Sequence, residues 1–232
     1  MTCSLRALRA LRAFALSFGL ASVFVAAPAA AQVHWDVGAD VGVMKRFLST
    51  GANTSSNAPD AGLGPVGELH LHFALLPLVR VGAYLSHDIS PQGGVPARQI
   101  TSGGLHLKLA SPWPNGRWRG WAFAGLGYAA VYAKSYHGVL PNQNPDGSNA
   151  DIFVEGSNGS FVEVPLGVGI AYKLKKPLEL TAVLGSRLGF GFAGDVYNSS
   201  VAHSPFSPPL EVTAAGNDSF ALYLAVGVSF EL

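Results

Sequence analysis

The segment Ser219–Leu232 alternates strictly between two kinds of side chain. One set is large and apolar, and comprises Phe220, Leu222, Leu224, Val226, Val228, Phe230 and Leu232. The other set is small or polar, with Tyr223 its only bulky member. Because successive side chains of a strand point to opposite faces, this pattern predicts a β-strand with one apolar face. In water such a face promotes aggregation, whereas in a transmembrane β-barrel it faces lipid.

Seven earlier segments repeat this period of two, which brings the number of predicted strands to eight. They are Val33–Phe47, Val66–Leu75, Leu78–Asp88, Thr101–Ala110, Trp118–Lys134, Phe161–Leu174 and Leu178–Phe192. The outward, apolar row of the last one includes Phe192, whereas the facing of Trp118–Lys134, rich in aromatic residues and glycine, is left open. The pattern predicts an all-β fold, an eight-stranded antiparallel up-and-down transmembrane β-barrel.

The connections between these segments alternate in length. Short turns at Leu76–Pro77, Ser111–Arg117 and Lys175–Pro177 interleave with long polar segments at Ser49–Pro65, Ile89–Ile100, Ser135–Ser160 and Gly194–Asp218. This alternation is typical of outer-membrane barrels, so we expect short periplasmic turns and long extracellular loops. Aromatic residues near the predicted rims indicate two girdles, with Trp35, Trp113, Trp118, Trp121, Tyr172 and Phe230 at one rim and Phe47, Tyr132 and Tyr136 at the other.

The composition and the N-terminal segment agree with a membrane protein that is exported. The chain is 49% hydrophobic and 12% charged, where about 25% charged residues is usual for a soluble domain. Arg6, Arg9 and Arg12 precede an apolar stretch and an Ala-x-Ala site, which predicts a cleaved secretory signal peptide over residues 1–31 and a barrel over 32–232. Without these arginines the chain is nearly neutral, which argues against nucleic acid as a partner.

Charged residues concentrate on the inward rows of the predicted strands. These residues are Asp36, Asp40, Glu68, Arg80, Asp88, Lys108, Glu163, Lys173, Glu179 and Arg187. An eight-stranded barrel is narrow enough for side chains to fill it, and buried charges are costly unless they are paired. We therefore expect a network of ion pairs inside the barrel. A polar conduit for small solutes would use the same residues, so that alternative stays open.

Metal binding and catalysis have weaker support in the sequence. Glu68, His70 and His72 project to one face, and with His106 nearby they could bind zinc or copper. Same-face neighbours on a strand are about 6.5–7 Å apart, however, which strains chelation, so we expect neither a metal nor another cofactor. The Ser-His arrangement of a lipid-modifying enzyme has no convincing candidate, because His137 and His203 fall in predicted loops without a Gly-x-Ser-x-Gly elbow.

The chain resembles the small eight-stranded bacterial outer-membrane proteins of the OmpA-transmembrane-domain, OmpX and OmpW type. The resemblance is carried by Gly-x-Gly strand motifs, Gly125-Leu126-Gly127 and Gly167-Val168-Gly169, and by the apolar terminal strand. It implies a Gram-negative outer-membrane location, contact with outer-membrane lipid and lipopolysaccharide, insertion by the barrel-assembly machinery, and a monomer. Since this fold hosts many activities, we expect a non-enzymatic structural or surface-interaction protein. A narrow, porin-like channel is the alternative, and a lipid-modifying enzyme a more distant one.

Overall fold

The computed structural model describes residues 34–49, 61–92, 95–111, 116–140, 150–197, 200–204, 207–212 and 217–232. The predicted signal peptide over residues 1–31 lies outside these ranges, as does Trp113. Among the described residues, no helix combines the length and the apolar character needed to cross a membrane.

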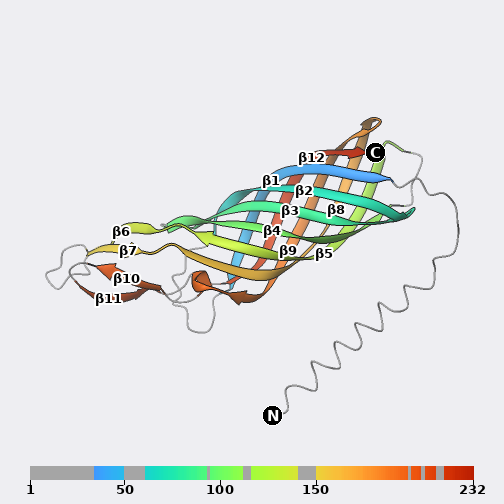
Figure 1. Ribbon diagram of the computed structural model, residues 1–232. Helices are drawn as coiled ribbons and strands as arrows, with labels where there is room; N and C mark the ends of the chain where they lie inside the picture. Colours follow the sequence, from blue (N-terminus) through green and yellow to red (C-terminus); the bar gives the residue numbers. More distant parts are fainter. Residues whose placement is uncertain are drawn as a thin grey trace, which may run out of the picture. The chain divides into compact units, whose positions relative to one another are not determined.

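Eight long strands form a closed antiparallel barrel (Figure 1). They are β1 (Trp35–Ser49), β2 (Leu63–Leu76), β3 (Val79–Gln92), β4 (Val95–Ala110), β5 (Trp118–Ala133), β8 (Ser157–Lys175), β9 (Leu178–Ala193) and β12 (Asn217–Glu231). Each strand pairs with its neighbours in the chain, and β12 returns to pair with β1, so the order around the barrel is β1-β12-β9-β8-β5-β4-β3-β2. The predicted eight-stranded up-and-down barrel is confirmed.

The pairing of β1 with β12 closes the barrel. Val37 lies opposite Phe230 and Val43 opposite Leu224, so the two apolar rows meet on the same outer face. Along this seam the strands approach closely at Gly42, where a Cβ atom would lie 2.0 Å from the carbonyl oxygen of Leu224. Closure leaves no strand edge of the barrel unpaired, which satisfies the backbone hydrogen bonds within the wall.

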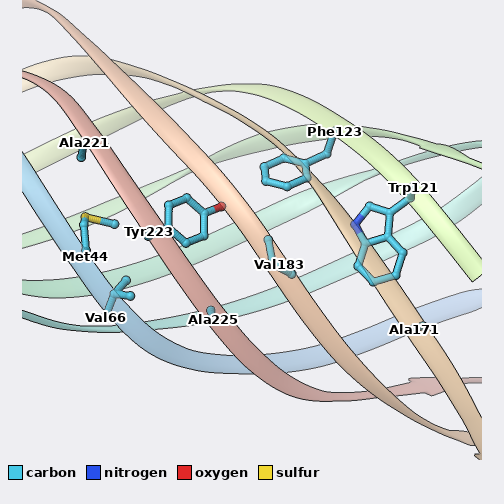
Figure 2. Packing of buried hydrophobic residues seen from close by; sticks show 9 residues of the cluster. All are labelled: Met44, Val66, Trp121, Phe123, Ala171, Val183, Ala221, Tyr223 and Ala225. Carbon is cyan, nitrogen blue, oxygen red and sulfur yellow. The ribbon is translucent and has the colours of Figure 1, made fainter.

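The outer face is apolar and the inner face is packed with side chains. Leu105, Leu126 and Leu184 are all at least 56% exposed, as expected for a surface that meets lipid. An inner apolar cluster, drawn in Figure 2, consists of Met44, Val66, Trp121, Phe123, Ala171, Val183, Ala221, Tyr223 and Ala225. Apolar as well as polar side chains therefore pack in the barrel interior.

The structure assigns the facing of β5, which the sequence left open. Trp121, Phe123 and Val131 point inward and are buried, whereas Leu126 and Tyr128 are about 60% exposed on the outside. The placement of Trp121 in a rim girdle was wrong, since its ring lies inside with the Lys108 ammonium 4.2 Å from the ring centroid. A strand that carries large apolar residues on both faces gives no alternation from which its facing can be predicted.

All four predicted long loops are partly strand, and in Ser49–Pro65 the strand residues are Ser49 and Leu63–Pro65. The segment Ile89–Ile100 continues the β3–β4 hairpin, with Ile89 opposite Gln99 and Ser90 opposite Arg98. In the other two, β6 (Tyr136–Leu140), β7 (Ala150–Val154), β10 (Ser200–Ser204) and β11 (Ser207–Val212) form a four-stranded sheet in the order β11-β10-β7-β6. Each connection forms its own hairpin, β6–β7 and β10–β11, and the two hairpins join where His203 of β10 pairs with Phe153 of β7.

A β-bulge at the end of β9 gives Phe192 a different facing from the outward one that the sequence predicted. Gly191 has a φ of +65°, and the pairing with β8 shifts between Ser160 and Val162. An extra residue in one strand breaks the alternation of faces. Phe192 therefore packs against the inward-facing Phe161, with ring centroids 5.4 Å apart, and not against lipid as predicted.

Candidate functional site

The inner face of the barrel gathers the charged residues predicted from the sequence. All ten predicted residues occupy inward positions, and all are buried except Glu68 and Lys173, which are partly exposed. Strands alternate small and large inward residues, so long arginine and glutamate side chains from opposite walls can meet across the interior. The contacts divide into a central group, a group towards the short turns and a group towards the long connections.

Arg187 of β9 is the centre of the central group and is 1% exposed. Its Nη2 donates to Glu68 of β2 at 2.8 Å, and its Nη1 donates to Glu163 of β8 at 3.1 Å. Nη1 also donates to the hydroxyls of Ser86 and Ser102. One guanidinium on β9 thus contacts side chains from β2, β3, β4 and β8.

Arg46 of β1 extends this central group. Its Nε and Nη2 donate to the two carboxylate oxygens of Asp88 at 2.8 and 2.7 Å, a bidentate geometry that fits the guanidinium fork. The same Nη2 lies 3.8 Å from Glu163 Oε2, and Tyr84 donates to Glu163 Oε1 at 3.2 Å. Glu163, although fully buried, therefore has two cations and a phenol as neighbours.

A second set of ion pairs lies towards the short turns. Asp36 accepts from Lys108 at 3.0 Å and from Arg80 at 3.2 Å. Glu231 accepts from Arg80 at 2.6 Å and from Arg119 at 3.0 Å. Arg119 also contacts Glu179 at 2.6 Å, and Lys173 lies 3.8 Å from both Glu179 and Glu231. These contacts link β1, β3, β4, β5, β8, β9 and β12 across the barrel.

The third set lies towards the long connections and includes the short 3₁₀ helix η2 (Asp195–Tyr197). Arg98 donates to Asp218 at 2.9 Å, and the Tyr197 hydroxyl donates to the same carboxylate at 2.9 Å. Burial and the neighbouring Asp218 carboxylate raise the pKa of Tyr197, so its hydroxyl remains a donor. Val196 and Tyr197 pack with the buried Phe161, so η2 closes over the inner face.

Sequence reasoning missed five members of these groups, namely Arg46, Arg98, Arg119, Asp218 and Glu231. Arg46 and Glu231 have the inward parity of their strands and could have been included on that ground. Arg98 and Asp218 fell in predicted loops, and Arg119 lies on the strand whose facing was left open. Apart from Lys173 and Glu179, which are six residues apart, the partners of these ion pairs are 24 to 151 residues apart in the chain, so the pairs had no local signal.

Three buried histidines lie beside the central group. His72 and His106 stack with ring centroids 5.8 Å apart, and His106 stacks on Tyr84 at 4.3 Å. His70 instead turns to Asp40, with its Nδ1 3.2 Å from Asp40 Oδ2. The potential metal-ligand atoms of Asp40, Glu68 and His70, one from each residue, all lie within 4.8 Å of one another, whereas His72 is not part of this set.

The cavities along the interior differ greatly in size. A cavity of about 440 Å³ opens at the short-turn end, beside Arg80, Glu179 and Glu231. Next to Asp40 and Glu68 the cavities are only about 10 and 20 Å³, which is room for roughly one water molecule each. The interior thus narrows sharply at the central group.

Comparisons with known proteins relate the chain to others only by structure. No protein-family model and no curated protein sequence matches it. Among solved structures, Neisserial surface protein A is 14% identical and has a TM-score of 0.49, and the match covers 85% of this chain and 97% of that one. OprG from Pseudomonas aeruginosa is 9% identical with a TM-score of 0.44, covering 86% and 96%. The N-terminal β-barrel domain of OprF from the same organism is 14% identical with a TM-score of 0.42, covering 87% and 100%.

These likenesses concern the fold alone. The strand order and pairing of the chain itself establish a closed eight-stranded antiparallel barrel with an apolar outer face. The chain has the architecture of the small eight-stranded outer-membrane barrels.

Proposed function

We propose that this protein is a non-enzymatic integral outer-membrane barrel with a structural or surface-interaction role, whose interior is closed by paired charges. The observation that carries the proposal is the central group, in which Arg187 contacts Glu68 and Glu163 from two other strands. Each of these groups is held by a partner of opposite charge. A conduit needs polar groups that remain free to interact with a passing solute, and this group offers few.

The narrowing of the interior supports a closed barrel. The voids of about 10 and 20 Å³ beside Asp40 and Glu68 are too small for a hydrated ion to pass without moving side chains. Those side chains include Tyr223, Trp121 and Phe123, which are large, buried and packed together. The larger cavity at the short-turn end is lined by other residues, among them Arg80, Glu179 and Glu231.

The connections beyond the barrel support a surface role. β6, β7, β10 and β11 pair into a sheet built from two separate connections, β5–β8 and β9–β12. Loops on a rigid scaffold commonly carry binding functions, and pairing between loops orders them for that purpose. We propose that this sheet is extracellular and that the apolar outer face contacts outer-membrane lipid and lipopolysaccharide. On the same view the barrel-assembly machinery inserts the chain, and the folded protein is monomeric.

Conductance in planar lipid bilayers tests this proposal. We expect the purified native protein to insert without a stable, resolved single-channel current. The variant Arg187→Ala, which removes the central cation, provides a comparison in which water can enter the interior. A stable conductance from the native protein would overturn the closed barrel and favour a narrow channel for small solutes.

A further inference from the structure

The contacts of Asp40 set it apart from the other buried carboxylates. Within the described residues, Asp36, Glu68, Asp88, Glu163, Glu179 and Asp218 each lie within 4 Å of an arginine or lysine. Asp40, which is 5% exposed, instead contacts Thr181, which donates to Oδ1 at 2.6 Å, and His70, which faces Oδ2 at 3.2 Å. Among the described residues, no arginine or lysine lies within 4 Å of its carboxylate, so its negative charge lacks the partner that the other six have.

We propose that Asp40, Glu68 and His70 form a binding site for a divalent transition-metal ion of the zinc type. The register of the sheet brings the three together, because Asp40 of β1 lies directly opposite Glu68 of β2, and His70 follows two residues later on the same face. Directly opposed residues have Cβ atoms only about 5 Å apart. The strain expected for neighbours along one strand is thus relieved by a ligand from the next strand.

The geometry fits a small ion with mixed nitrogen and oxygen ligands. Ligand atoms 2.0–2.1 Å from a tetrahedral zinc ion lie roughly 3.3 Å apart, close to the 3.2 Å between His70 Nδ1 and Asp40 Oδ2. One imidazole and two carboxylates favour zinc, copper or nickel over magnesium or calcium. Beside these residues is the void of about 20 Å³, which is large enough for one ion or water.

Neighbouring groups already orient the ligands. Thr181 holds one oxygen of Asp40 and Arg187 holds Oε2 of Glu68, so each carboxylate is oriented and still has a second oxygen. His70 fits its place because Gly38 lies opposite, where a Cβ atom would come within 2.3 Å of the ring. The Nε2 of His70 is buried without a hydrogen-bond partner among the described residues.

The nearby positive charges do not exclude a metal ion. Lys108 borders the same void, but its ammonium is bound to Asp36 at 3.0 Å and lies over the ring of Trp121. Arg187 is shared between two carboxylates. His72 and His106 also border the void, and neither ring nitrogen of His72 has a hydrogen-bond partner among the described residues.

Zinc retention by the folded barrel tests this site. The mature chain, residues 32–232, is refolded into detergent micelles with zinc and desalted, and its zinc content is measured by inductively coupled plasma mass spectrometry. Its affinity for zinc is measured by competition against a chromogenic chelator. We expect about one zinc ion per chain. His70→Gln and Asp40→Asn should weaken binding at least tenfold, whereas His87→Gln, at an exposed histidine bonded to Thr101, should retain native affinity.

Thr181→Val keeps all three ligands and removes only the hydrogen bond to Asp40, so we expect a loss of about 10- to 100-fold in affinity. This variant keeps the test valid if the ligand variants do not fold, which far-ultraviolet circular dichroism monitors. Failure of the native protein to retain zinc would overturn the site. Equal retention by native protein, Thr181→Val and His70→Gln would also overturn it.

Discussion

Replacement of Arg187 by alanine removes the cation on which the central group depends. In the native barrel its guanidinium is 1% exposed and contacts Glu68, Glu163 and two serine hydroxyls. Removal of one partner of a buried ion pair costs about 3–5 kcal/mol, since the remaining charge is left uncompensated. The loss of unfolding free energy in this barrel depends on which other partners Glu68 and Glu163 retain.

Glu163 retains Arg46 at 3.8 Å and the hydroxyl of Tyr84 at 3.2 Å, so its charge remains partly compensated. Glu68 loses the only arginine or lysine that lies within 4 Å of it among the described residues. We therefore expect Arg187→Ala to lower the free energy of unfolding by about 3 kcal/mol, the lower end of that range. The additional change Glu68→Gln removes the lone charge and should restore about 1–2 kcal/mol.

Equilibrium urea unfolding in short-chain lipid vesicles, followed by tryptophan fluorescence, measures these differences. Lys173→Ala is the matched control, because Lys173 is 39% exposed and 3.8 Å from its partners, and it should change the free energy of unfolding by only about 0–1 kcal/mol. If Arg187→Ala is no more destabilising than Lys173→Ala, the paired-charge account of the interior is wrong. A change in ion selectivity without loss of stability would favour the channel instead.

Three further predictions concern the wall and the topology. Leu184→Arg places a charge on the outer face, where Leu184 is 56% exposed, and should cost about 2–4 kcal/mol in the same unfolding assay; an unchanged free energy would contradict the outward facing of β9. Gly42→Ala drives a methyl group into the backbone of β12 and should cost about 1–3 kcal/mol. Gly67→Ala should cost clearly less, because its Cβ atom would lie 4.0 Å from the carbonyl oxygen of Asp40, and equal effects would argue against the close approach at Gly42. Ser200→Cys should react with a membrane-impermeant maleimide on intact cells, whereas Lys176→Cys should react only after the outer membrane is breached. The opposite pattern would reverse the proposed orientation of the barrel in the membrane.

The facing of most strands followed from the sequence alone because it depends only on local alternation. In β12 and β1 the large apolar residues recur at every second position, and lipid accepts only that row, so the outward set could be identified without knowledge of any partner strand. The facing could not be predicted, or was predicted wrongly, where apolar and polar residues do not alternate regularly along the strand. Trp118–Ala133 is apolar on both faces, and the Gly191 bulge inserts a residue that turns Phe192 inward.

The ion pairs required the tertiary structure. Arg187 lies 119 residues from Glu68, and Arg80 lies 151 residues from Glu231, so no window of sequence contains both partners. The register between strands decides these contacts, and it also sets Asp40 opposite Glu68 and thereby changes the candidate metal ligands from a single strand to two. Alternation along one strand determines which face a side chain occupies, whereas closure of the barrel determines which side chains meet across the interior.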